Sequence, residues 1–241
     1  MNRITYLEHS GFAITLPSVI LVFDCFRDPS HALHRILEQN TDKPVVFFVS
    51  HAHHDHFDKS IFELAQNHRR TYVISNDVPA RVIPSTLAVQ GMSAGDYVEN
   101  LPGIKGVKAY PSTDEGVSFY VETADGPTIF HAGDLNDWHW QSESSDKEVE
   151  KADRDFTKIV NLIASEHPAI DVVMFPVDVR QGDDFGRGAR IFMEKIKVSD
   201  FFPMHFCGDY KLACNTESYL STGTTAHCLH TPGESIDISH R

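Results

Sequence analysis

Positive charge is the first thing that this sequence has little of. It carries 21 Lys and Arg against 34 Asp and Glu, for a formal net charge of -13. A basic footprint for nucleic acid or anionic lipid is absent overall, so we expect neither as a partner. No apolar run approaches the roughly 18 residues that span a bilayer, and the first ten residues lack the apolar stretch of a signal peptide. We therefore expect a cytoplasmic protein without a membrane partner.

Cysteine is also scarce. The chain has Cys25, Cys207, Cys214 and Cys228, and no two of them form a C-x-x-C pair. This spacing argues against a zinc ribbon and against a dithiol redox motif. Because disulfides are rare in a reducing cytosol, we expect free thiols that are buried or half-buried.

What the chain does have is an ordinary globular composition, with 41% hydrophobic and 23% charged side chains over 241 residues. We expect a single domain over residues 1–241, because the length suits one and no low-complexity linker divides it. Strands come first in a block and later alternate with helices, which favours a sandwich with helices outside the sheets. We expect strands at 4–7, 12–16, 19–24, 45–49, 71–75, 107–111, 117–123, 128–131, 171–177 and 200–204, and helices at 30–39, 59–67, 156–163 and 189–196.

A cluster of imidazoles and carboxylates follows the apolar run at residues 45–49. His51, His53, Asp55 and His56 form the pattern H-x-H-x-D-H directly after it. Imidazole nitrogens and carboxylate oxygens are ligands for Zn²⁺, Mn²⁺ and Fe, and a buried strand gives the loop a rigid base. The pattern predicts a metal site, with the intervening His54 facing solvent or lying behind the ligands.

The stretch S-H-A-H-H-D-H resembles the signature of the metallo-β-lactamase superfamily. Two later motifs extend the resemblance over most of the chain: F-H-A-G-D, which ends at Asp134, and F-P-M-H, which ends at His205. The early L-V-F-D, ending at Asp24, is similar to the family's N-terminal strands. The resemblance implies an α+β fold, a four-layer αββα sandwich with metals at one edge of the two sheets.

The resemblance also implies roles for these residues. His51 and His53 would bind a first metal ion, Asp55, His56 and His205 would bind a second, and Asp134 would bridge them. Asp55 and Asp134 would thereby serve catalysis. One or two divalent ions are expected, Zn most of all, with Mn or Fe as alternatives. A hydroxide between the ions would attack the substrate.

The sequence departs from the family's pattern in one place. A further histidine for the first ion is expected about 20 residues before Asp134, but that region reads A-Y-P-S-T-D-E-G and has none. Asp114 is one replacement, and its oxygen would favour Mn²⁺ or Fe²⁺ over Zn²⁺. A weak or empty first site and completion by His139 are the other two readings. Asp114 could also be no more than a turn residue before Gly116.

Several features near these motifs have two readings each. Trp138 and Trp140 either shape a substrate pocket or pack locally. Asp178 and Arg180 either orient a ligand histidine or hold an anionic substrate, or they form an ion pair that braces a loop. Cys207 could approach the site, although a buried position is expected.

His9 and His131 lie near predicted strand ends. We expect both to be structural and assign neither a catalytic role.

We therefore expect a metal-dependent hydrolase of a small ester, lactone or phosphoester. Within the superfamily the early H-S-G-F and the compact chain look most like the group containing L-ascorbate-6-phosphate lactonase. A non-catalytic metal- or ligand-binding protein and an iron-dependent oxidoreductase on the same scaffold are the alternatives. The partner is a small-molecule substrate, and a homo-oligomer is compatible with the sequence.

Overall fold

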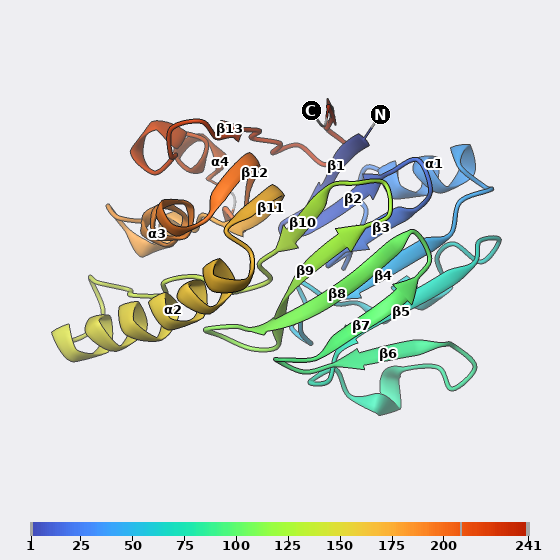
Figure 1. Ribbon diagram of the computed structural model, residues 1–241, viewed down its shortest axis with the longest axis horizontal. Helices are drawn as coiled ribbons and strands as arrows, with labels where there is room; N and C mark the ends of the chain where they lie inside the picture. The colour runs from blue at the N-terminus through green and yellow to red at the C-terminus, as the bar shows by residue number, and fades with distance from the viewer. Residues whose placement is uncertain (1, 208, 240–241) are drawn as a thin grey trace.

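The computed structural model describes residues 2–207 and 209–239 (Figure 1). Two seven-stranded sheets form its centre. The first sheet has the order β14-β1-β2-β3-β4-β5-β6, made of Ser235–Ile238, Asn2–Glu8, Gly11–Thr15, Ile20–Phe23, Val45–Val49, Arg70–Ser75 and Val89–Met92. The second has the order β13-β12-β11-β10-β9-β8-β7, made of Thr225–Ala226, Lys197–Met204, Ala169–Pro176, Thr128–His131, Val117–Thr123, Ile104–Pro111 and Tyr97–Leu101.

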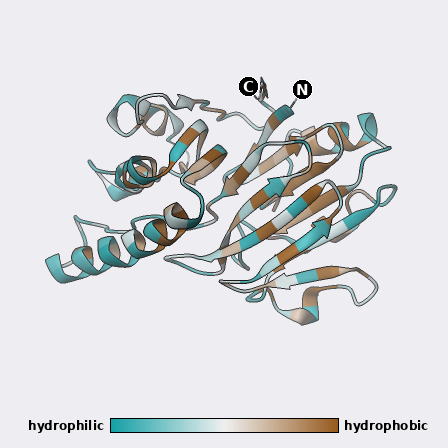
Figure 2. Cartoon of the chain, viewed as in Figure 1, coloured by the Kyte–Doolittle hydropathy of each residue, from teal (hydrophilic) through white to brown (hydrophobic). Residues whose placement is uncertain are grey.

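Helices cover the outer faces of the two sheets. Helix α1 (Ala32–Gln39) packs on the first sheet together with the short 3₁₀ turn η1 (Lys59–Glu63). Helices α2 (Asp146–Glu166) and α3 (Arg187–Lys195) pack on the second, and α2 is hydrophilic along most of its exposed length (Figure 2). The short α4, η2, η3 and η4 are Tyr210–Ala213, Ala80–Val82, Val179–Gln181 and Thr216–Ser218. The fold is the expected four-layer αββα sandwich.

Strand β4 shows why the metal-site loop has a rigid base. All five of its residues are buried, and they alternate between two cores. Val46 and Phe48 enter the core between the sheets, while Val45, Phe47 and Val49 enter the core beneath α1. Side chains alternate along a strand, so this run is buried on both faces.

The direction of the strands brings distant motifs to one edge. Strands β3 to β6 are parallel in the first sheet, and β10 to β12 are parallel in the second. The carboxyl ends of parallel strands meet at the same edge, so the loops that follow them meet there. The loops after β3, β4, β10, β11 and β12 carry Asp24, His51, Asp134, Asp178 and His205.

Most expected elements are confirmed. The Asp125–Gly126 turn joins β9 and β10 as an antiparallel hairpin. The helix expected at residues 59–67 is wrong: only a 3₁₀ turn forms, and it ends at Glu63. The Arg70 guanidinium donates to the carbonyl oxygens of Phe62 and Leu64 at 2.8 and 3.1 Å, so these oxygens are satisfied without a longer helix.

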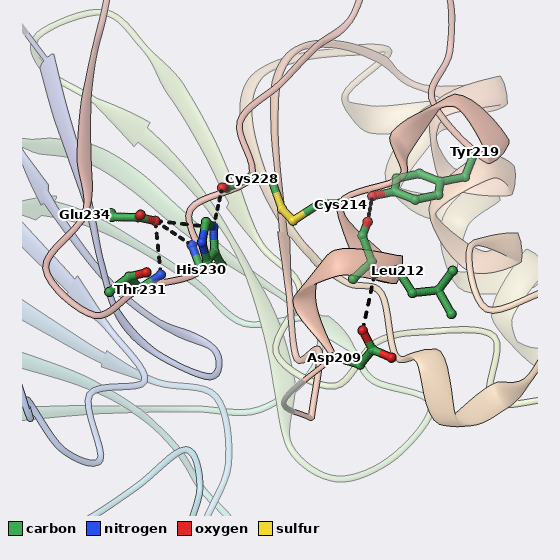
Figure 3. The surroundings of a disulfide bond; sticks show 9 residues. Asp209, Leu212, Cys214, Tyr219, Cys228, His230, Thr231 and Glu234 are labelled. Carbon is green, nitrogen blue, oxygen red and sulfur yellow. Dashed lines mark hydrogen bonds and ion pairs between the residues drawn. A yellow bond between two sulfur atoms is a disulfide. The ribbon is translucent and has the colours of Figure 1, made fainter.

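The prediction of uniformly free thiols is also wrong. Cys214 and Cys228 form a disulfide with a Cα–Cα distance of 5.6 Å, which joins α4 to the segment before β14 (Figure 3). Cys25 is free and buried, whereas Cys207 is free and exposed instead of buried. Within residues 2–207 and 209–239, none of the helices combines the length and apolarity needed to cross a membrane.

Candidate metal centre

The metal-site loop leaves β4 and turns back on itself at once. The amide groups of His56 and Phe57 donate to the carbonyl oxygen of His53 at 3.0 and 2.9 Å. The base of the loop is crowded by the turn before β9, where Gly116 has a φ of +69° and its missing Cβ would lie 2.0 Å from the Ser50 carbonyl oxygen. Only glycine fits this close approach, which places the S-T-D-E-G segment against the loop.

A first group of ligand atoms consists of His51, His53 and Asp134. His51 Nε2 lies 3.0 Å from His53 Nδ1 and 3.4 Å from Asp134 Oδ2. The His51 and Asp134 side chains are buried, while His53 is exposed. One atom from each residue lies within 4.8 Å of the others, so one ion could be held by all three.

A second group consists of His9, Asp55, His56 and His205, again with one atom from each within 4.8 Å of the others. His9 Nε2 lies 3.5 Å from Asp55 Oδ2. Asp134 lies between the two groups: its Oδ1 is 3.1 Å from His56 Nε2 and 3.6 Å from His205 Nε2. The structure thus brings together six of the seven residues predicted as ligands and adds His9.

Hydrogen bonds on the far side of three imidazole rings fix which nitrogen faces the centre. The Ser50 amide and hydroxyl donate to Asp24 at 2.7 and 2.6 Å, and the His56 Nδ1 atom lies 2.8 Å from the same carboxylate. Because the Ser50 hydroxyl proton is given to Asp24, its oxygen accepts from His51 Nδ1 at 2.9 Å. Nε2 of His51 and Nε2 of His56 therefore both point toward Asp134. A metal-binding histidine is commonly oriented in this way, by a hydrogen bond on its other ring nitrogen.

The third ring is oriented from β11. His205 Nδ1 lies 3.0 Å from Asp178 Oδ2, and the guanidinium of Arg180 donates to both oxygens of that carboxylate. The pair is therefore an ion pair that also orients a histidine of the site, while the role in holding an anionic substrate stays a prediction. The Cys207 thiol also approaches, 3.6 Å from Asp178 Oδ2.

Electrostatics at this edge favour cations. Burial alone lowers the pKa of the His56 imidazole, but the carboxylates of Asp134 and Asp24 outweigh it and raise that pKa to about 10. Burial likewise opposes the charge on His205, and the Asp178 carboxylate raises its pKa to about 9. Buried carboxylates therefore hold positive charge here, as protons or as a metal ion.

Unpaired buried atoms support a cation. Nε2 of His9, Nε2 of His56 and Oδ1 of Asp134 are buried and make no hydrogen bond to any described residue. The last two atoms face each other at 3.1 Å, as an ion pair without the angles of a hydrogen bond. Burial, with the neighbouring His205 and His56, lowers the pKa of His9 to about 3, so its imidazole is neutral at physiological pH. Leaving such atoms without a partner is costly, and divalent-metal coordination would satisfy all three.

Backbone strain gathers at the same place. Eight non-glycine residues have a positive φ in the described chain, and five of them lie at or beside the centre: His9, Asp24, Trp140, His205 and Cys207. Such conformations persist only where the surroundings impose them, and they concentrate at functional sites. The His205 amide donates to the His9 carbonyl oxygen at 3.2 Å, which ties the two sheets together there.

No histidine takes the position that the family pattern expects before Asp134, and the two candidate replacements lie outside both ligand groups. Asp114 is exposed and lines the same cavity as His53, but its carboxylate belongs to neither ligand group. Glu115, its neighbour, has Oε2 3.8 Å from His53 Nε2. His139 is buried beside the carbonyl oxygen of Asp184, with Nε2 3.4 Å away, and also belongs to neither group.

Two cavities meet at the centre, and Asp55 lines both. The first, of about 340 Å³, is polar and contains His53, Asp134, Trp138 and Arg180. We call it the polar cavity. The second, of about 520 Å³, lies on the side of His9. A substrate centred on the ligand groups would therefore have room on two sides.

Comparisons with known proteins agree with this geometry. The family model described as beta-lactamase superfamily domain matches residues 3–154. A UPF0173 metal-dependent hydrolase from Pyrococcus furiosus is 25% identical over 254 residues, covering 99% of this chain and all of the relative.

Two solved structures are similar in fold. The metallo hydrolase Igni18 from Ignicoccus hospitalis has a TM-score of 0.66 at 16% identity, covering 100% of this chain and 99% of that chain. CmlA, a diiron beta-hydroxylase from Streptomyces venezuelae, has a TM-score of 0.64 at 12% identity, covering 98% of this chain and 54% of the other.

Proposed function

The chain belongs to the beta-lactamase superfamily, and from this premise we propose that it is a metal-dependent hydrolase of small esters, lactones or phosphoesters. The observation that carries the proposal is the position of Asp134. Its two oxygens face different ligand groups, with buried and unpaired nitrogen and oxygen atoms around them. The name of the Pyrococcus furiosus relative points the same way.

We assign the ligands as follows. His51, His53 and Asp134 would hold one divalent ion. His9, Asp55, His56 and His205 would hold a second, on the other side of Asp134. Ions held there would polarise a substrate oxygen and lower the pKa of a bound water toward neutrality.

The surrounding side chains prepare this chemistry. Asp24 and Asp178 hold the Nδ1 atoms of His56 and His205, so Nε2 of each ring faces the centre. Once that nitrogen loses its proton, no reorientation is needed on binding. Asp55 reaches both cavities and is more exposed than Asp134, so its carboxylate can accept a proton from a group entering either side.

Asp134→Asn tests the assignment, and Asp114→Asn, in the same cavity, is measured beside it. We expect the first variant to lose most of its bound metal, measured by mass spectrometry, and at least ~100-fold in hydrolysis. Asp114→Asn tests the remaining prediction that Asp114 is a ligand: unchanged metal content would remove it from the site. An Asp134→Asn protein with full metal and full activity would overturn the proposal.

The substrate panel should contain a simple ester, a phosphodiester and a sugar-phosphate lactone. Turnover of the lactone alone would support the narrower resemblance to the L-ascorbate-6-phosphate lactonase group. Retained metal without any turnover would favour a binding protein. Two bound irons with oxidase or hydroxylase activity would favour the oxidoreductase alternative, for which the fold of CmlA is the supporting observation. Cytoplasmic location and a homo-oligomeric state remain part of the proposal.

A further inference from the structure

The larger cavity beside the metal centre is walled mainly by rings. We call it the aromatic cavity; its lining includes Tyr6, His9, Phe26, Phe206, Tyr210 and His230. Tyr6 and Phe206 are tilted at a centroid distance of 5.9 Å, and Tyr210 stacks on His230 at 4.0 Å with 13° between the ring planes. Ring faces arranged in this way favour a planar apolar guest.

The aromatic cavity opens on the atoms that would react. His9 and Asp55 belong both to its lining and to the second ligand group. A group seated between the rings is therefore adjacent to any bond placed at that group. At about 520 Å³ the cavity lies within the usual range of small-molecule sites, roughly 300–1,000 Å³.

Charge in the aromatic cavity disfavours an anionic guest. Its Arg27 is already paired with the Glu8 carboxylate through two nitrogens and lies over the Phe26 ring, 5.1 Å from the centroid. Asp55, at the inner end, belongs to the second ligand group. Because Glu8 already occupies the Arg27 guanidinium, that guanidinium is not free to pair with a negatively charged guest.

The stacked wall is fastened by the disulfide. Tyr210 begins α4, which ends just before Cys214. His230 lies two residues after Cys228, on the other side of the disulfide (Figure 3). The His230 amide also donates to Glu234 Oε2 at 2.8 Å. Two segments that are separate in the sequence are thus held together, which keeps the wall in place before a substrate arrives.

We propose that the aromatic cavity binds the uncharged aromatic part of the substrate, and that Tyr210 and His230 determine this specificity. The proposal rests on the hydrolase function proposed above and narrows its substrate class to aromatic esters. The reacting bond would lie at the ligand groups, with the smaller part of the substrate in the polar cavity.

Tyr210→Ala tests the proposal, and Leu212→Ala is its control. Leu212 lies on the same short helix, is 42% exposed and is absent from the lining of the cavity. The measured quantity is kcat/KM for 1-naphthyl acetate divided by kcat/KM for ethyl acetate, because the ratio between variants cancels the intrinsic reactivity of each ester. We expect a fall of at least ~10-fold in Tyr210→Ala and less than ~2-fold in Leu212→Ala.

A binding measurement separates the two proposals. Titration of the metal-free protein with 1-naphthol should show binding that Tyr210→Ala weakens at least ~5-fold and Leu212→Ala leaves unchanged. If 1-naphthol binds in this way but no ester is hydrolysed, the proposed hydrolase function is refuted. The proposal that the aromatic cavity binds an aromatic group then stands. Hydrolysis with the same ester ratio in wild type and Tyr210→Ala would overturn the cavity's role. If Tyr210→Ala does not fold, Phe26→Ala on another wall takes its place. It is judged by the same ester ratio and by the same change in affinity for 1-naphthol.

Discussion

Metal binding at neutral pH should release at least about two protons from this protein. In the metal-free state the carboxylates around His56 and His205 raise their pKa values to about 10 and about 9. At pH 7.5 both rings therefore carry nearly a full proton each, and a ring must lose it to coordinate a metal. His9 contributes none, since its pKa is lowered to about 3.

Calorimetry in buffers of different ionisation enthalpy measures this release directly. Zinc added to the metal-free protein at pH 7.5 should release at least about two protons, because deprotonation of a bound water would add to the two from the rings. Asp178→Asn supplies the control: an amide does not stabilise the His205 imidazolium, so the release should fall by about one proton. A release near zero in the wild type, or the same release in Asp178→Asn, would refute the reasoning.

The same shifts set how the metal-free protein responds to pH. A histidine whose pKa is raised on folding adds stability that is fully present below pH 6.5 and is lost as pH approaches the folded value. For His56 that window runs from 6.5 to about 10. The free energy of unfolding should therefore decrease over this range by a few kcal/mol, on the order of 1.4 kcal/mol per pKa unit. Urea unfolding at pH 6.5, 8 and 10 measures it, and a flat profile would contradict the assignment.

Two further predictions concern the supports of the site. Gly116→Ala should cost at least ~2 kcal/mol and lower metal content, because its Cβ would meet the Ser50 carbonyl oxygen; Gly126→Ala, also at positive φ but with nothing within 4 Å, is the control for backbone strain alone. Equal unfolding midpoints for the two would contradict this account. Cys214→Ser should lower stability by about 3 kcal/mol, as expected for opening a loop of this size, with its partner 14 residues away. Urea unfolding of wild type with reductant should match the variant.

Much of the site could be predicted from local sequence patterns, because several of its ligands directly follow a predicted strand. The run at residues 45–49 and the H-x-H-x-D-H that follows it are neighbours in sequence, so strand and loop could be predicted together. Asp134 and His205 could be predicted only through the resemblance to the family. The motifs that contain them, F-H-A-G-D and F-P-M-H, are too short and too common to indicate a metal ligand alone. The strand order that places them beside His51 is a property of the whole fold.

Other features depend on contacts that no local pattern encodes. The sequence predicts a structural role for His9, because it is a lone histidine near a predicted strand end, yet the structure places it in the second ligand group. It reaches the centre because the turn between β1 and β2 contacts the end of β12, 196 positions away. The Cys214–Cys228 pairing and the cavity wall that it fastens likewise arise from how the C-terminal segment packs.

The two ligand groups draw on both sheets, and this has a consequence for folding. His51, His53, Asp55 and His56 come from the first sheet, whereas Asp134 and His205 come from the second. An ion bound between them would cross-link two halves that also meet through a shared apolar core and through contacts such as that of His131 Nε2 with the Ser10 carbonyl oxygen. Each tenfold excess of metal over its dissociation constant would then add about 1.4 kcal/mol to the folded state. Metal supply would set the lifetime of the protein as well as its activity.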